Sequence, residues 1–220
     1  MLVAFPLRYV ERKSWTKNYD ELCGREDRLV RMDTVARFGL SVTDGLFMSS
    51  RDGYNFTKFD EAFIAPPPEN PESFVYGDGT AVPIVIEVPS DIPGADNEYM
   101  ILVRESYRTA VDHNKLVKYT IRMDGFVSLH AGSEPSVAVT KPFIYDGGDL
   151  YANIATSARG GAFFTLTSGN EEYTSVEIFG NAVDKRIRFE DDDAVKKLSG
   201  KEVTLTVRMF DCDLYAIRFQ

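Results

Sequence analysis

The sequence has few of the residues that build metal sites and thiol chemistry. Its 220 residues include two cysteines, two histidines and one tryptophan. Cys23 and Cys212 lie far apart, and His113 and His130 are isolated, so a zinc site built on thiolates or imidazoles is not expected. Two free, buried thiols are favoured over a disulfide, which the sequence leaves open. We expect no cofactor; a structural calcium ion stays an alternative, although no calcium-loop signature is present.

Positive charge is also scarce. Lys and Arg number 25 against 34 Asp and Glu, which gives a net charge of −9. Such a surface repels phosphate backbones, so no nucleic-acid partner is expected. The apolar run at the N-terminus is interrupted by Arg8 and follows no positive region, which is untypical of a signal peptide or a membrane span. We therefore expect no membrane partner, and a cytoplasmic location, or secretion if the chain belongs to a longer precursor.

The sequence also shows little helical periodicity. Only Lys13–Arg28 and Asp193–Leu198 offer a turn or two of helix. The rest alternates on a period of two, is rich in Phe and Tyr, and is interrupted by Gly, Pro and Asp-Gly turns. The sequence therefore predicts an all-β fold.

The pattern changes near residues 109–125. Before this point the strands are separated by long, Pro-rich connections such as Ile64–Tyr76, and long loops on a β scaffold often carry function. After it, eight strands with short turns are predicted: VSLHAG, SVAVTKPFIY, DLYANIATS, GAFFTLTS, TSVEIFG, KRIRFE, KEVTLTVRMF and DLYAIRFQ. Apolar residues alternate with polar ones from Glu202 to Met209, which is typical of an antiparallel β-sandwich.

The stretch SSRDGYNF, from Ser49 to Phe56, predicts a hairpin. Asp52 and Gly53 suit its turn, because Gly adopts positive φ readily and Asp accepts local hydrogen bonds. Asp52 is therefore interpreted as a turn residue. Asp44, just upstream, begins the apolar strand and is the better candidate for a catalytic carboxylate, with an ordinary strand-end Asp as the alternative.

Two arginines interrupt apolar strands. Arg8 and Arg104 each cost desolvation unless they meet a carboxylate or a ligand, so both are candidate substrate-binding residues. Glu105 must point to the opposite face from Arg104 and shares its face with Tyr107. A carboxylate beside a ring suits a sugar, so Glu105 is a candidate catalytic residue and Tyr107 a candidate binding residue. An edge-strand salt bridge is the alternative.

Glycoside hydrolysis needs two carboxylates about 5–10 Å apart. The sequence offers Asp44, Glu87, Glu105 and Asp124, but no spacing shows that any two converge. The sequence contains no G-x-S-x-G, P-loop, H-E-x-x-H or G-x-G-x-x-G motif, which lowers the expectation of a serine hydrolase, NTPase, zinc protease or dehydrogenase.

Several motifs, in order, resemble those of bacterial proteins related to the five-bladed β-propeller glycoside hydrolases, the superfamily of arabinanases, invertases and levansucrases. They are AFPLRYV, DGLFMSSRDGYNF, IVIEVPSDIPGADNEYMILVRESY, KYTIRMDGFVSLHAG and LTVRMFDCDLYAIRF. The resemblance implies that residues 1–112 form the last blades of a partial propeller. It implies a jelly-roll-like accessory β-sandwich over 113–220.

The superfamily's catalytic carboxylates lie mostly in early blades, and nothing in this sequence matches them. We therefore expect a carbohydrate-active, glycoside hydrolase-like protein in a truncated or catalytically deficient form, with a carbohydrate ligand. One alternative is a non-catalytic glycan-binding sandwich on which Tyr145, Tyr151 and Tyr173 stack on sugar rings. Another is an interaction domain that forms homo-oligomers through open blade edges, or that pairs with missing N-terminal blades.

Overall fold

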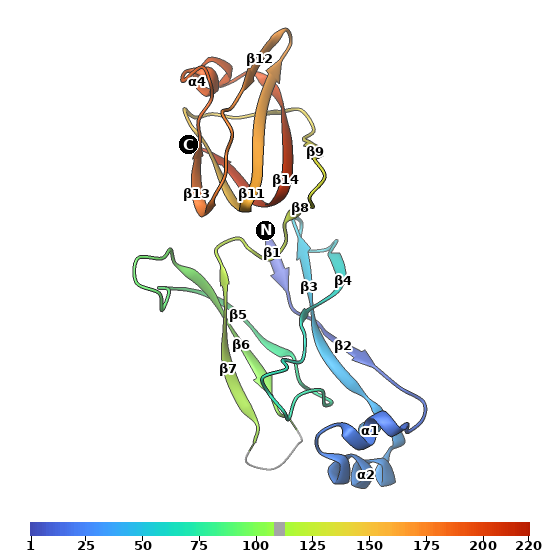
Figure 1. The fold of residues 1–220 in the computed structure, drawn as a ribbon. Coiled ribbons are helices and arrows are strands. Elements are labelled where there is room, and N and C mark those ends of the chain that lie inside the picture. Colours follow the sequence, from blue (N-terminus) through green and yellow to red (C-terminus); the bar gives the residue numbers. More distant parts are fainter. Residues whose placement is uncertain (108–112) are drawn as a thin grey trace. The chain divides into compact units, whose positions relative to one another are not determined.

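The structure is a computed structural model that describes residues 1–107 and 113–220 (Figure 1). It confirms the all-β class: strands dominate and the helices are short. The described residues divide into two compact units, Met1–Pro93 with Asn97–Ile121, and Gly94–Asp96 with Arg122–Gln220. The division falls after Ile121 instead of residue 112, because β7 (Lys115–Arg122) joins a sheet of the first unit. No helix of the described residues is long and apolar enough to cross a membrane.

The first unit begins with a four-stranded antiparallel sheet. Its strands are β1 (Leu2–Ala4), β2 (Leu7–Val10), β3 (Val42–Ser50) and β4 (Thr57–Ile64). Both β1 and β2 pair with β3, one along each half of it, and β4 pairs with its other edge. The predicted N-terminal strand is therefore present in two segments, separated at Pro6, which has no amide hydrogen to donate to the ladder.

The β3–β4 hairpin turns at Asp52, as predicted. One Asp52 oxygen accepts hydrogen bonds from the backbone amides of Tyr54 (2.9 Å) and Asn55 (2.8 Å), and the other accepts one from the Asn55 side chain (2.7 Å). These bonds hold the pKa of Asp52 well below its usual range. Gly53 has φ 81°, the conformation for which glycine is favoured. Asp52 is thus a turn residue.

Three short helices separate β2 from β3: α1 (Lys17–Glu21), α2 (Arg25–Thr34) and α3 (Ala36–Leu40). The helical region thus continues beyond the predicted Lys13–Arg28. A side chain at Gly39 would place its Cβ 2.3 Å from the Arg28 carbonyl oxygen and 2.4 Å from Met32 Cγ. Only glycine therefore allows α3 to lie this close to α2.

A second, three-stranded sheet completes the first unit, in the order β5–β6–β7. It contains β5 (Thr80–Val88), β6 (Glu98–Glu105) and β7, and β5 pairs antiparallel with β6. The long Pro-rich loop predicted over Ile64–Tyr76 connects β4 to β5 and lies within this unit.

The second unit is built around two long antiparallel strands, β11 (Leu150–Ser168) and β14 (Glu202–Phe219). The remaining elements are β8 (Leu129–Ala131), β9 (Ser136–Val139), β10 (Phe143–Ile144), β12 (Glu171–Thr174), β13 (Asn181–Ile187) and α4 (Ala194–Leu198). The sheet order is β10–β14–β11–β12, with β13 also on β11, and β8 and β9 on β14.

Two pairs of predicted strands are each a single strand in the structure, so the prediction of separate strands was wrong there. The predicted strands DLYANIATS and GAFFTLTS are separated by a segment that contains Gly160, but this segment is an irregularity within β11 between Thr156 and Gly161. A Cβ at Gly160 would lie 2.0 Å from the Asp211 carbonyl oxygen. The glycine thus permits close backbone contact between β11 and β14, and no reversal of the chain occurs.

The apolar core of the second unit follows the predicted alternation. Val203, Leu205, Val207 and Met209 are at most 3% exposed, whereas their polar neighbours are half-buried or exposed. These residues belong to a single buried cluster, to which β11 contributes Leu150, Ile154 and Phe164 and α4 contributes Leu198. Sequence periodicity therefore predicted the inward face of β14 correctly.

Candidate functional site

Arg8 and Asp44 are direct partners across two strands. They lie opposite each other in the β2–β3 register. Arg8 Nε donates to Asp44 Oδ1 at 2.8 Å and Arg8 Nη2 to Asp44 Oδ2 at 2.5 Å, while Arg8 Nη1 donates to the Asp60 carbonyl oxygen at 2.6 Å. Its pairing with Asp44 raises the pKa of Arg8. Arg8 therefore has its partner within the protein, and this partner is Asp44, the candidate catalytic carboxylate.

Glu105, at the end of β6, lies in a different polar cluster. Its side chain is 8% exposed. Asn70 Nδ2 donates to Glu105 Oε2 at 3.0 Å, and the Tyr119 hydroxyl donates to Glu105 Oε1. Asn70 Nδ2 also lies 3.0 Å from Ser106 Oγ. Burial, and to a smaller extent the hydrogen bond to Glu105, raises the pKa of Tyr119. The Tyr119 hydroxyl therefore keeps its proton and remains a donor.

A pocket with a volume of about 560 Å³ opens beside this cluster. Glu105, Asn70 and Tyr119 contribute polar groups to its wall, and Lys115 and Lys118 contribute cationic ones. Pro67, Pro71 and Val117 supply apolar surface, and Glu69 is an exposed carboxylate of the same lining. We call this cavity the first pocket. Its lining includes neither Arg8 nor Asp44, so the predicted pair Asp44 and Glu105 does not share it.

Asp78 is a buried carboxyl group close to Glu105, on the turn before β5. It is 3% exposed. Its Oδ1 accepts a hydrogen bond of 2.8 Å from the Tyr107 amide, and its Oδ2 has no partner. Burial raises the pKa of Asp78 to about 6, and the charge of Glu105 adds to the increase. No sequence pattern indicated this residue as part of a site.

Arg104 and Tyr107 contact each other outside the first pocket. The Arg104 guanidinium carbon lies 3.9 Å from the centroid of the Tyr107 ring, and Arg104 Nη2 donates to Thr80 Oγ1 at 3.3 Å. The predicted alternation, which placed Tyr107 on the face of Glu105, stops at Ser106 because this residue has φ 56°. Neither Arg104 nor Tyr107 lines the first pocket.

The three tyrosines proposed as stacking platforms on the second unit are only partly available. Tyr145 is 6% exposed and donates to the Val195 carbonyl oxygen at 2.6 Å, so its predicted exposure was wrong. It stacks on Phe219 with the ring centroids 4.0 Å apart. Tyr151 and Tyr173 are half-buried and lie near the cationic groups of Arg218 and Lys197.

Sequence reasoning missed Asn70 and Tyr119, the two residues that hold Glu105. Asn70 belongs to the long Pro-rich loop, which was the available signal. Within residues 1–107 and 113–220, no group of three or more His, Cys, Asp or Glu side chains converges in a way that could hold a metal ion. Cys23 and Cys212 are free thiols, half-buried and buried respectively.

Comparisons with known proteins add no family to this geometry: no protein-family model, no curated protein and no solved structure matches the chain.

Proposed function

We propose that this chain is a carbohydrate-active, glycoside hydrolase-like protein that binds a glycan in the first pocket and does not hydrolyse it. The observation that carries the proposal is the buried Glu105 carboxylate, fixed by Asn70 and Tyr119 at the wall of a pocket of about 560 Å³. That volume lies within the range of small-molecule sites. The resemblance of the sequence motifs to propeller glycoside hydrolases supports the ligand class.

The lining provides both kinds of contact that a sugar makes. Sugar hydroxyls donate to carboxylate oxygens and accept from ammonium groups, which Glu105 and Lys115 offer. The C–H faces of the ring pack on apolar surface, which Pro67 and Pro71 offer. Because Glu105 is already held by two neighbours, little side-chain freedom is lost when a ligand binds.

The same geometry argues against hydrolysis. Both Asp44 oxygens accept hydrogen bonds from Arg8, so this carboxylate is committed to an ion pair and lies outside the lining of the first pocket. Glu69 is the other carboxylate of the pocket, but it is exposed to solvent. A general acid normally keeps its proton through burial, which Glu69 lacks. Among the described residues that line the first pocket, Glu105 therefore has no buried carboxylate as a partner.

The test is calorimetric titration of the full chain with neutral oligosaccharides, including arabino- and fructo-oligosaccharides, while released reducing sugar is measured in the same samples. We expect saturable binding without turnover. Glu105→Gln should weaken binding about tenfold or more, because it replaces a carboxylate acceptor with an amide. Tyr119→Phe should weaken it less, because the carboxylate stays in place.

Glu87→Gln is the matched control. Glu87 also accepts a hydrogen bond from an asparagine amide, Asn97 Nδ2 at 2.6 Å, but it lies outside the lining of the first pocket. Its substitution should leave binding unchanged. Turnover that disappears in Glu69→Gln or Asp44→Ala would overturn the claim that the chain does not hydrolyse glycans. Absence of binding to every oligosaccharide would overturn the glycan proposal itself.

A further inference from the structure

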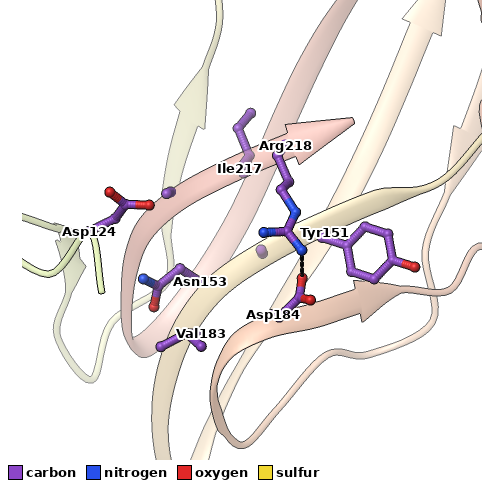
Figure 2. Close-up of a pocket in the computed structure, with 9 residues that line it drawn as sticks. Asp124, Tyr151, Asn153, Val183, Asp184, Ile217 and Arg218 are labelled. Atoms are coloured by element: carbon purple, nitrogen blue, oxygen red, sulfur yellow. Dashed lines mark ion pairs between the residues drawn. The ribbon is translucent and has the colours of Figure 1, made fainter. Parts of the chain in front are cut away.

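A second pocket lies wholly within the second unit, where β11 departs from regular pairing with both neighbours (Figure 2). The register against β13 shifts between Ala152 and Ile154, and the register against β14 shifts between Asn153 and Ile154. Such irregularities redirect side chains and are frequent beside functional sites. Here they place Asn153, Val183 and Asp184 around one cavity with a volume of about 80 Å³.

The central residue of the second pocket is Asn153. It is 4% exposed, and its Nδ2 donates to the Met123 carbonyl oxygen at 2.5 Å. Its Oδ1 is buried and has no hydrogen-bond partner. A buried acceptor without a partner costs free energy unless a water molecule or a ligand donates to it. Because Nδ2 is held by the backbone of Met123, the amide is fixed with its oxygen unsatisfied.

The groups around Asn153 are a mixed set of acceptors and donors. Figure 2 shows the Asn153 amide with the Asp124 carboxylate on one side and the ion pair of Arg218 and Asp184 on the other. Arg218 Nη2 lies 2.6 Å from Asp184 Oδ1, and the guanidinium lies 5.4 Å from the centroid of the Tyr151 ring. The remaining lining is apolar or backbone, from Ala152, Val183, Ala216 and Ile217.

This mixture favours a neutral ligand over an ion. An anion would face the carboxylates of Asp124 and Asp184 and is disfavoured by charge, whereas a divalent cation would have to lie beside the Arg218 guanidinium. A neutral hydroxyl group can donate to Asn153 Oδ1 or Asp124 and accept from Arg218. The small volume admits one edge of a sugar ring and not a whole oligosaccharide.

We propose that this second pocket binds two adjacent hydroxyl groups of a neutral sugar, with Asn153 and Asp124 as acceptors and Arg218 as donor. The site shares no residue with the first pocket, and it depends on the proposed function only for the class of ligand. A chain with both sites would contact a glycan in each of its two units.

The test is a nuclear magnetic resonance titration of the full chain with methyl galactoside and methyl glucoside, with calcium chloride and sodium phosphate as competing probes. The signals to follow are the Asn153 side-chain amide and Arg218 Nε. We expect both to shift saturably with at least one glycoside and with neither salt. Asp124→Asn should weaken that binding about tenfold, since it removes a charged acceptor. Asparagine tolerates the left-handed φ of 52° at this position.

Asp149→Asn is the control, because it makes the same substitution at a carboxylate outside the second pocket. Asp149 forms an ion pair with Arg186 at 2.6 Å, as Asp184 does with Arg218. This substitution should leave the titration unchanged. No saturable shift of Asn153 with either glycoside, or a shift with calcium or phosphate instead, would overturn the proposal. Loss of the Asn153 response in Glu105→Gln, with no effect of Asp124→Asn, would also overturn it, because the response would then originate in the first pocket. If only the first-pocket proposal is wrong, Glu105→Gln should have no effect on binding, and the Asn153 response should remain.

Discussion

The two units of this chain differ in how many polar side chains they bury. The second unit holds twenty buried apolar residues in one cluster. Among the described residues, its buried polar side chains are Asn153 and Ser175, whereas the first unit buries Arg28, Ser41, Thr43, Ser50, Asn70, Asp78, Glu105 and Ser106. Each polar group in the first unit needs a specific partner, since a buried polar atom without one is costly.

This difference also separates the two pockets. The first pocket is built from a long loop and strand ends, and its polar wall continues into buried groups such as Asp78. The second pocket is an irregularity in a sheet that otherwise follows an apolar pattern. We infer that buried polar side chains contribute more to the stability of the first unit than to that of the second.

The largest expected effect is on the apolar core of the second unit. Phe164 is fully buried, so Phe164→Ala should lower the free energy of unfolding by about 3–5 kcal/mol, through lost burial and the cavity that remains. Urea denaturation followed by circular dichroism measures this loss. Thr204 lies on the face of β14 that points away from the core, so Thr204→Ala should lower the free energy of unfolding far less. Equal losses in the two variants would contradict the core assignment.

Arg28 gives the corresponding test in the first unit. It is 2% exposed and donates to the carbonyl oxygens of Cys23 (3.0 Å), Gly39 (3.2 Å) and Phe74 (2.5 Å). Arg28→Met should lower the free energy of unfolding by about 2–4 kcal/mol, because three carbonyl groups lose their donor.

The single tryptophan, Trp15, lies in the first unit, so its fluorescence reports unfolding there. The fluorescence midpoint in urea should fall more in Arg28→Met than in Phe164→Ala. Arg25 lies on the same helix as Arg28, and Arg25→Ala, which removes an exposed ion pair with Asp20 of α1, should leave this midpoint nearly unchanged. The reverse order would break the comparison between the units.

The smallest expected effect is a gain in stability. The pKa of Asp78 is about 6 in the folded protein against an ordinary value of 3.8, so the folded state binds this proton more tightly than the unfolded state. The free energy of unfolding should therefore fall as pH rises from about 4 to about 6, and then level off. Asp78→Asn should remove this fall and stabilise the protein at pH 7 by about 1–3 kcal/mol.

Asparagine keeps the Oδ1 acceptor for the Tyr107 amide, so Asp78→Asn should fold normally. Denaturation curves at several pH values give the measurement, with the exposed Asp96→Asn as control. An unchanged pH dependence in Asp78→Asn would show that Asp78 is ionised at no cost in the folded state.

Local patterns in the sequence predicted local structure well. The turn at Asp52 and the buried face of β14 depend on neighbours within a few residues, and both are confirmed. The same reasoning separated β11 into two strands, because a glycine pair indicates a turn unless the opposing backbone is known. At Gly160 the deciding contact is Asp211, which lies far along the chain.

The candidate site was predicted only in part, for the same reason. Desolvation cost indicated that Arg8 needs a partner but could not identify Asp44, which lies 36 residues away. Glu105 was selected because it was expected to share a face with Tyr107, yet its partner Asn70 lies 35 residues away in an irregular loop. Periodicity shows which face a strand residue occupies; it does not show which loop covers that face.

The most direct test of the central claim compares binding and turnover in the same titration, for the wild-type chain, Glu105→Gln and Glu87→Gln. We expect a neutral oligosaccharide to bind the wild type and Glu87→Gln equally, to bind Glu105→Gln about tenfold or more weakly, and to be cleaved by none of them. Equal binding by all three proteins, or reducing sugar released by the wild type, would contradict this expectation.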